Sequence, residues 1–235
     1  MQGLMMDYQL NMPAILRRAD ELFPGREIVS RLPDKGWHRT TYGDVASRTK
    51  RLAVALRGLG LQDGDRVATF MWNHHEHLET YIGAPVGGFV THTLNLRLHP
   101  DDNTYIATHA GDRVLVVDKV LWPLASQFVE RCGFEHVIAV GDGPTPDGAI
   151  EYEELIADAD ESAFTYRDID ERAAAAMCFT SGTTGLPKGV VYSHRAIALH
   201  ALTIGPGVGL TTADVVLPVV PMFHANAWCV PFACT

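Results

Sequence analysis

The sequence has few cysteines and no block of basic residues, and each of these absences excludes a class of protein. The four cysteines form no C-x-x-C pair and stand in apolar surroundings, which predicts buried, reduced thiols rather than a disulfide framework. They are Cys132, Cys178, Cys229 and Cys234. The formal net charge is -9, and no stretch is rich in lysine or arginine, so nucleic acid is excluded as an expected partner.

Targeting and membrane-spanning signals are also lacking. Residues 1–13 have neither the basic n-region nor the apolar h-region of a secretory signal, and no apolar run approaches the roughly 18 residues of a spanning helix. We therefore expect a cytoplasmic protein without a transmembrane segment, for which peripheral membrane contact stays open. Its 235 residues, 47% of them apolar and 20% charged, are typical of one large or two modest globular domains.

Short apolar runs alternate with amphipathic stretches along most of the chain. The expected strands are 28–32, 37–41, 66–71, 90–96, 113–117, 136–140 and 215–219. The expected helices are 10–23, 41–59, 76–89, 100–110, 121–131, 152–157 and 193–202. Alternating strands and helices predict an α/β fold with mostly parallel sheets flanked by helices. The acidic stretch 158–171 divides the chain into a first α/β portion, residues 1–170, and a portion over 171–235 with two motifs.

The first motif is residues 180–189, Thr-Ser-Gly-Thr-Thr-Gly-Leu-Pro-Lys-Gly, between two segments that resemble buried strand ends. Its glycines let the backbone turn its N–H groups inward, and its hydroxyls and Lys188 offer donors to phosphate oxygens. The Walker pattern fails, because its second glycine falls on Pro187 and no Ser or Thr follows the lysine. The glycine spacing does not fit the dinucleotide fingerprint either. A polyphosphate loop is predicted, with a surface turn as the alternative.

The second motif is Pro221-Met-Phe-His-Ala-Asn-Ala-Trp228, directly after the expected strand 215–219. A histidine just past a strand end is where α/β folds place ligand-contacting groups. A lone histidine would more often be a satisfied core residue, but the phosphate loop earlier in the chain favours a functional His224.

A third candidate, Asn73-His-His-Glu-His77, suggests a zinc site. Two of its histidines could share a helix face, but no further ligands are suitably spaced. The stretch fits a helix start better, with Asn73 as N-cap and Glu76 completing a capping-box-like pattern.

The first motif resembles the ATP-loop signature of the AMP-forming adenylating superfamily, which comprises acyl-CoA synthetases, luciferases and peptide-synthetase adenylation domains. Pro221, Phe223 and His224 resemble the segment that borders the acyl and adenylate site there. The string through Trp228, and residues 91–98 and 190–196, resemble medium- and long-chain fatty acyl-CoA synthetases. The resemblance runs from near the N-terminus to Thr235.

This resemblance implies an incomplete large AMP-binding domain over residues 1–235, in which 171–235 holds the phosphate loop and the acyl-site strand. Family members continue with an aromatic-Gly-x-Thr-Glu segment, a ribose-binding aspartate and a small C-terminal domain that supplies the adenylation lysine. The implied function is a fatty acid–CoA ligase, which uses Mg-ATP to form an acyl-adenylate and then CoA to form the thioester. We expect this chain alone to turn over poorly or not at all.

The resemblance also implies roles for individual residues. His224 would be catalytic and lie near the carboxylate, Trp228 would screen the acyl tunnel, and Thr180 would ligate Mg²⁺. The implied ATP contacts are Thr180, Ser181, Gly182, Thr183, Thr184, Gly185 and Lys188.

Two alternatives stay open. One is an aryl- or short-chain acid CoA ligase, against which the Trp228 string weighs. The other is a non-catalytic nucleotide-binding fragment. Since an incomplete domain exposes surface meant to be buried, we also expect aggregation or a homodimer.

Overall fold

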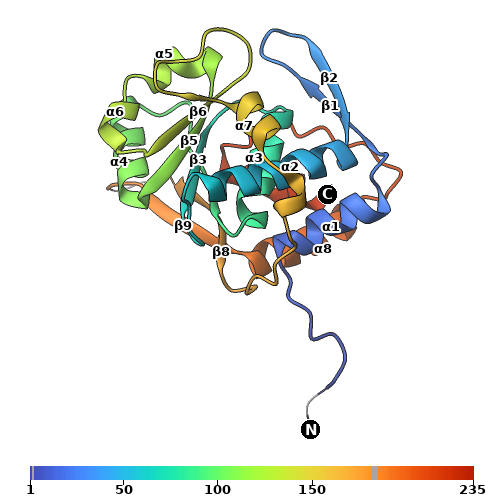
Figure 1. Cartoon of the computed structure of the whole chain (residues 1–235). Helices are drawn as coiled ribbons and strands as arrows, with labels where there is room; N and C mark the ends of the chain where they lie inside the picture. The colour runs from blue at the N-terminus through green and yellow to red at the C-terminus, as the bar shows by residue number, and fades with distance from the viewer. Residues whose placement is uncertain (2, 181–184) are drawn as a thin grey trace.

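The computed structural model describes residues 1, 3–180 and 185–235, and a seven-stranded sheet forms its centre (Figure 1). The strand order is β7-β6-β5-β3-β4-β8-β9, and every neighbouring pair is parallel except β8 and β9. The strands are β3 (Arg66–Phe70), β4 (Val90–Thr93), β5 (Asp112–Asp118), β6 (His136–Val140), β7 (Ile150–Glu151), β8 (Ala174–Thr180) and β9 (Lys188–Ser193). The predicted α/β fold with a mostly parallel sheet is confirmed.

Helices cover both faces of this sheet (Figure 1). On one face, side chains of α2, α3 and α7 pack with alternate residues of β3, β5 and β6, and on the other face α4 packs with the intervening residues. The helices of the first portion are α1 (Met12–Leu22), α2 (Tyr42–Gly58), α3 (His75–Val86), α4 (Pro100–Ala110), α5 (Trp122–Ala125), α6 (Val129–Cys132) and α7 (Tyr152–Asp158). In the later portion, α8 (His194–Val208) and α9 (Val230–Ala233) pack with β8 in a third cluster that also contains α1.

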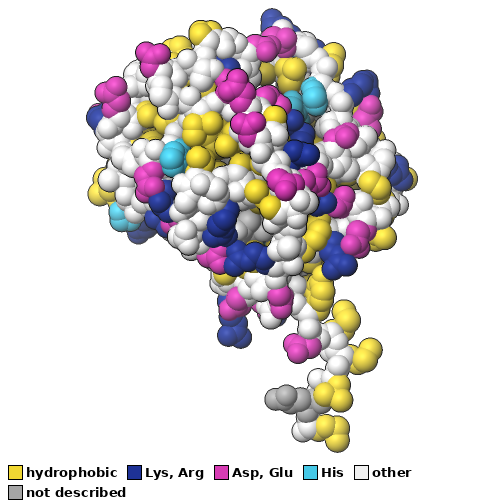
Figure 2. All heavy atoms as spheres, in the orientation of Figure 1, with side chains coloured by type: hydrophobic (Ala, Val, Ile, Leu, Met, Phe, Trp, Pro, Cys, Tyr) yellow, Lys and Arg dark blue, Asp and Glu magenta, His cyan; other side chains and the backbone are white. Residues whose placement is uncertain are grey.

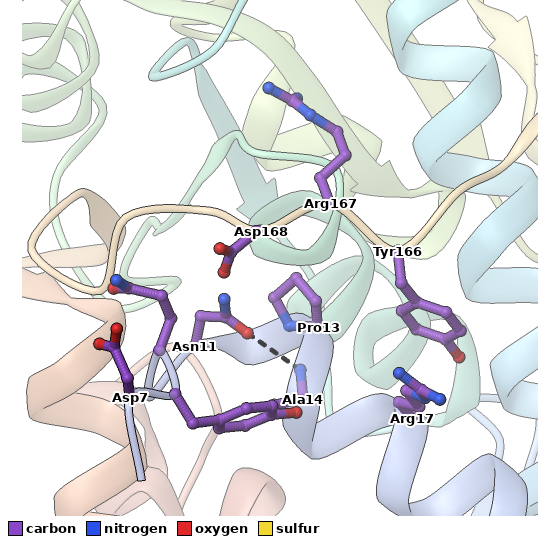
Figure 3. Close-up of a pocket in the computed structure, with 10 residues that line it drawn as sticks. Asp7, Asn11, Pro13, Ala14, Arg17, Tyr166, Arg167 and Asp168 are labelled. Atoms are coloured by element: carbon purple, nitrogen blue, oxygen red, sulfur yellow. Dashed lines mark hydrogen bonds between the residues drawn. The ribbon is translucent and has the colours of Figure 1, made fainter. Parts of the chain in front are cut away.

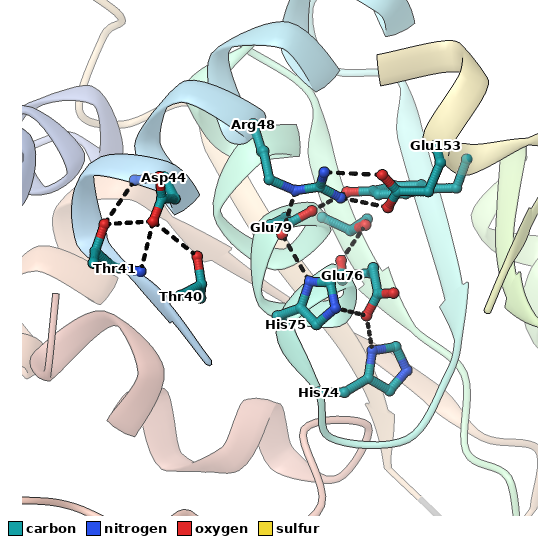
Figure 4. Close-up of polar contacts among 11 residues, drawn as sticks. Thr40, Thr41, Asp44, Arg48, His74, His75, Glu76, Glu79 and Glu153 are labelled. Carbon is teal, nitrogen blue, oxygen red and sulfur yellow. Dashed lines mark hydrogen bonds and ion pairs between the residues drawn. The ribbon is translucent and has the colours of Figure 1, made fainter. Parts of the chain in front are cut away.

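Local sequence signals set several of these elements. Thr41 caps α2 through a reciprocal pair with Asp44, in which each side chain accepts a hydrogen bond from the other residue's backbone (Figure 4). Helix α4 begins at Pro100 and ends at Gly111, whose φ of +66° is the left-handed conformation that glycine adopts freely. The strands predicted over 28–32 and 37–41 form β1 (Glu27–Arg31) and β2 (Trp37–Thr41), which pair antiparallel.

The single helix predicted over 121–131 is wrong. The chain instead forms a 3₁₀ turn, η1 (Lys119–Leu121), followed by the two short helices α5 and α6. The break lies at Phe128, which leaves helical geometry and buries its ring against Phe70, with the two centroids 5.3 Å apart. Core packing of an aromatic side chain therefore overrides helical periodicity here.

The strand predicted over 215–219 is also wrong, since the segment has no regular secondary structure and no described strand pairs with it. Val215, Leu217 and Val219 are 98%, 81% and 79% exposed. Apolar alternation forms a strand only where a neighbouring strand and a covering layer are present.

Two further features concern the surface. None of the helices within the described ranges has the length and hydrophobicity needed to cross a membrane. The N-terminal tail extends from the body and exposes apolar side chains, among them Leu4, Met5 and Met6 (Figure 2).

The predicted burial of the thiols is confirmed for Cys132, Cys178 and Cys229, whereas Cys234 is half-buried.

Candidate functional site

The predicted phosphate loop begins at the carboxyl edge of the parallel sheet. Strand β8 ends at Thr180, and its register pairs Ala176 with Thr91 and Met177 with His92 of β4. The ends of β4 and β8 therefore lie side by side, at the edge where open α/β sheets bind ligands.

The second motif, residues 221–228, contacts the same carboxyl edge of the sheet. The hydroxyl of Thr93, the last residue of β4, lies 3.4 Å from the Phe223 carbonyl and 3.2 Å from Oδ1 of Asn226. The Phe223 ring is buried in the hydrophobic cluster against which Phe179 of β8 also packs. The fold thus brings the two predicted motifs to neighbouring strand ends.

The described residues of the loop are exposed, except for the half-buried Pro187. Thr180 and Lys188 face each other as the last register pair of β8 and β9, and the Thr180 hydroxyl lies 3.5 Å from the Lys188 carbonyl. Gly185 has φ of +104°, a conformation that an L side chain rarely adopts. The predicted ATP contacts Ser181, Gly182, Thr183 and Thr184 lie outside the described residues.

His224 and Trp228 are both exposed, in a turn of unusual geometry. The His224 amide donates to the Pro221 carbonyl at 2.9 Å, and the Trp228 carbonyl accepts from Nε2 of His200 in α8 at 3.0 Å. The segment η3 (Ala225–Cys229) has φ of +45° to +56° at five successive non-glycine residues. Left-handed backbone costs an L-residue roughly 1–2 kcal/mol each, so the segment persists only because its surroundings hold it.

Asn73 is a site residue that sequence reasoning placed wrongly. It was expected to cap α3, but the N-cap is His74, whose side chain makes no capping hydrogen bond to a described backbone amide of the helix. The Asn73 side chain turns instead to residues 218–222. Its Nδ2 donates to the carbonyls of Pro218 (3.3 Å) and Val220 (3.1 Å), and its Oδ1 accepts from the Met222 amide at 2.8 Å. The sequence signal that could have indicated this contact is the position of Asn73 just beyond the end of β3.

Directly after Asn73, a buried histidine lies between two carboxylates. Nε2 of His74 is 2.7 Å from Asp118 Oδ1, and Nδ1 is 2.7 Å from Glu76 Oε2. Burial alone would lower the pKa of His74, but the hydrogen bonds and negative charge of Asp118 and Glu76 outweigh it and raise this pKa to about 9. His74 is therefore an imidazolium at neutral pH. The Trp72 amide donates to the other oxygen of Asp118 at 2.8 Å.

The carboxylates extend this pair into a network that joins three helices (Figure 4). His75 contacts Glu76 and Glu79, each at 3.0 Å, while Arg48 of α2 reaches Glu79 at 2.8 Å and also pairs with Glu153 of α7. Burial lowers the pKa of His75, but the two glutamates raise it to about 9. The network fixes the start of α3 against α2 and α7.

These contacts engage the ring nitrogens that the zinc alternative would require. In the described part of the chain, no group of three or more His, Cys, Asp or Glu side chains could hold a metal ion. His77, the other candidate ligand, lies 3.0 Å from both the Thr69 hydroxyl and the Trp72 carbonyl, and burial lowers its pKa to about 3. The histidines serve the fold instead.

A cavity of about 240 Å³ lies elsewhere, beside the start of α1 (Figure 3). Its two cations are already paired, Arg17 with Glu21 at 2.7 Å and Arg167 with Asp63 at 2.5 Å. The neighbouring Leu10 amide donates to Glu171, just before β8 begins, so the cavity lies toward the amino edge of the sheet. It is separate from the candidate site.

Comparison with known proteins gives a consistent result. The family model described as AMP-binding enzyme matches residues 16–235. The long-chain-fatty-acid–CoA ligase of Thermus thermophilus is 49% identical over 98% of this chain and 42% of its own length. The 3-methylmercaptopropionyl-CoA ligase of Ruegeria lacuscaerulensis is 40% identical over 100% of this chain and 45% of its own. The chain thus spans less than half the length of these relatives.

Solved structures of the same kind share the fold. A long-chain-fatty-acid-CoA ligase from Archaeoglobus fulgidus superposes with a TM-score of 0.82 at 22% identity, covering 96% of this chain and 45% of its own. A benzoate CoA ligase from Burkholderia xenovorans has a TM-score of 0.75 at 28% identity, covering 91% and 40%.

Proposed function

The chain belongs to the AMP-binding enzyme family, and from that premise we propose that it supplies the phosphate loop and acyl-site segment of an AMP-forming fatty acid–CoA ligase. The observation that carries this proposal is the meeting of β8 and residues 221–228 at one sheet edge, through Thr93. A triphosphate and a carboxylate bound by these two motifs would be neighbours, as adenylation requires.

The reaction has two steps. A substrate carboxylate attacks the α-phosphorus of ATP, which forms the acyl-adenylate and releases pyrophosphate. The CoA thiol then attacks the acyl carbon, and AMP leaves. Both steps depend on positioning and on the neutralisation of charge on oxygen atoms.

For ATP, we assign the β- and γ-phosphates to the loop 180–188, with Lys188 as a mobile cation at its exposed end. Thr180 is the proposed Mg²⁺ ligand. One hydroxyl fits a magnesium ion that takes its other ligands from phosphate oxygens and water, the usual arrangement in nucleotide sites. Bound with ATP, Mg²⁺ would neutralise charge on the phosphate oxygens.

For the acid, we assign His224 to the carboxylate and Trp228 to the acyl tunnel. The support is that both side chains are exposed, with His224 directly after the buried Phe223 and the Trp228 carbonyl held by His200. His224 would orient the carboxylate toward the α-phosphorus, and the indole would screen the tunnel from water.

We propose a medium- or long-chain fatty acid as substrate, on the strength of the string through Trp228. The relatives do not share one acid: their names include long-chain fatty acid, 3-methylmercaptopropionyl and benzoate ligases. An aryl or short-chain acid is therefore the alternative. Each buried methylene is worth ~0.8 kcal/mol. A tunnel that is a few carbons longer therefore shifts the preference between acids of different length by orders of magnitude. We place the reaction in the cytoplasm, with carboxylate, ATP and CoA as the partners.

Carboxylate-dependent ATP–pyrophosphate exchange tests the proposal. It would be measured with acids from acetate to palmitate, on this chain and on one extended through its natural downstream sequence. Exchange in the extended protein, strongest with medium or long acids, is expected, together with little or none from residues 1–235. A maximum with benzoate or acetate would favour the alternative acids, and exchange in neither protein would refute the function.

A further inference from the structure

Asn73 lies where the rigid part of the sheet meets the acyl-site segment. Its two chain neighbours are both held by the buried Asp118: the Trp72 amide donates to Oδ2 at 2.8 Å, and the His74 ring lies 2.7 Å from Oδ1. The Asp118 and His74 side chains are 3% and 2% exposed, so water hardly competes for these bonds. The Asn73 backbone is therefore fixed on both sides.

Its side chain uses both its donor and its acceptor on a segment about 145 residues further along the chain. The amide nitrogen binds the Pro218 and Val220 carbonyls, and the oxygen binds the Met222 amide. Before this contact, Leu217 and Val219 are largely exposed, while Met222 and Phe223 just after it are 4% and 3% exposed. Asn73 thus holds the point at which the segment enters the core.

The residues that follow Met222 and Phe223 include the strained turn 225–229, so the place where the segment enters the core affects how that turn is held. The left-handed turn 225–229 holds backbone strain, and the burial of Asn226, Ala227 and Cys229 helps to hold it in place. Within the turn, Thr93 contacts Asn226 and His200 holds the Trp228 carbonyl, but His224 lies before both of them. On its carboxyl-terminal side the His224 carbonyl accepts from the Ala227 amide at 2.9 Å, and on its amino-terminal side Thr93 contacts the Phe223 carbonyl while Asn73 holds residues 218–222.

We propose that Asn73 is a positioning residue, which fixes residues 218–222 on the carboxyl end of β3 and thereby sets where His224 and Trp228 lie. Its value for the reaction rests on the proposed function, whereas the positioning itself can be measured without any substrate. The asparagine amide is required because it supplies a donor and an acceptor on one short side chain.

The experiment compares Asn73→Ala and Asn73→Asp with the matched control Asn95→Ala, in the chain as it stands. Asn95 follows the end of β4 and is also half-buried, and among the described residues its side chain accepts a hydrogen bond only from the nearby Arg97 amide, at 2.9 Å. Amide hydrogen exchange would be followed at residues 216–229 and in the sheet strands. The environment of Trp228 would be read from 19F NMR of fluorotryptophan-labelled protein.

In Asn73→Ala we expect the Met222 amide to exchange about tenfold faster, and the Trp228 resonance to shift, while the sheet strands keep their protection. In Asn73→Asp, the acceptor for Met222 remains but the donor to Pro218 and Val220 is lost and a charge faces two carbonyls. This variant should keep Met222 protected and still shift Trp228. Asn95→Ala should leave both the Met222 exchange rate and the Trp228 resonance unchanged.

Two results would overturn the proposal. One is a Trp228 resonance and Met222 exchange that are the same in Asn73→Ala as in Asn95→Ala. The other is a combination of two observations: Asn73→Ala loses protection uniformly throughout the sheet, and the Trp228 resonance does not shift in Asn73→Asp. Asn73 would then stabilise the fold as a whole rather than position residues 218–222. Because no acid or nucleotide is present, failure of the ligase proposal leaves these outcomes unaffected.

Discussion

The sheet from β7 to β8 and the chain from β9 to residue 220 contain similar apolar patterns but bury them very differently. Leu115 of β5 is fully buried between helices, whereas Val191 of β9 is 56% exposed and Leu217 is 81% exposed. No described strand pairs with the outer edge of β9. The difference teaches that an apolar pattern specifies a strand or a core position only where other elements pair with it and cover it.

The largest expected effect contrasts two aspartates, one in each region. Asp118→Ala should lower the free energy of unfolding by about 3–5 kcal/mol, because it leaves the buried His74 with one charge partner instead of two. Asp214→Ala removes only an exposed turn contact with Thr211 and should cost about 1 kcal/mol or less. Urea denaturation of both variants measures the contrast; equal losses would mean that the Asp118 network does not stabilise the sheet.

A leucine pair tests the same contrast without charge. Leu115→Ala should lower the free energy of unfolding by about 2–5 kcal/mol through lost burial and a cavity. Leu217→Ala should change it by less than about 0.5 kcal/mol. Denaturant midpoints at constant slope would report both values. A loss above 1 kcal/mol at Leu217 would show that the 215–220 segment is covered in solution.

The stability of the sheet region should also depend on pH. His74 and His75 have folded pKa values raised to about 9, so their contribution is fully present below the unfolded value near 6.5 and is lost as the pH rises through about 9. Raising the pH from 6.5 to 9.5 should therefore remove roughly 3 kcal/mol through His74 alone. In His74→Gln the stability should be lower at pH 6.5 and vary less up to pH 9.5. A pH profile unchanged by this substitution would contradict the assignment.

The smallest effect concerns association through the exposed region. Val191→Lys combined with Leu217→Lys should reduce self-association and binding of the dye ANS, because both replace exposed apolar surface by charge. Val120→Lys, at a position 59% exposed in η1, is the matched control and should change neither. Analytical ultracentrifugation would decide. Equal oligomer content in all three proteins would place any homodimer on another surface.

Much of the fold could be predicted from the sequence where the signal is local. The capping pair of Thr41 and Asp44, and the Pro100 and Gly111 boundaries of α4, are defined by residues within one helix. Helix–strand alternation likewise predicted the parallel sheet. The break at Phe128 could not be predicted, because it depends on a ring that β3 supplies from far along the chain.

The candidate site likewise has a part that local sequence predicts and a part that depends on long-range contacts. The loop from Thr180 to Lys188 was recognisable because its chemistry is contiguous in sequence. The contact of Thr93 with the second motif joins residues 130 positions apart, and the Asn73 contacts span up to 149. Such contacts have no local pattern. Asn73 was misassigned because asparagine satisfies a cap and a tertiary contact equally well.

The left-handed turn at 225–229 has a consequence for chirality. At Ala225 and Ala227, with φ of +45° and +47°, the backbone has the hand that a mirror-image amino acid prefers. The usual ranking of alanine above glycine is therefore inverted there, and D-alanine would fit these positions better than either. The segment beside His224 thus consists of L-residues in a shape that suits their enantiomers.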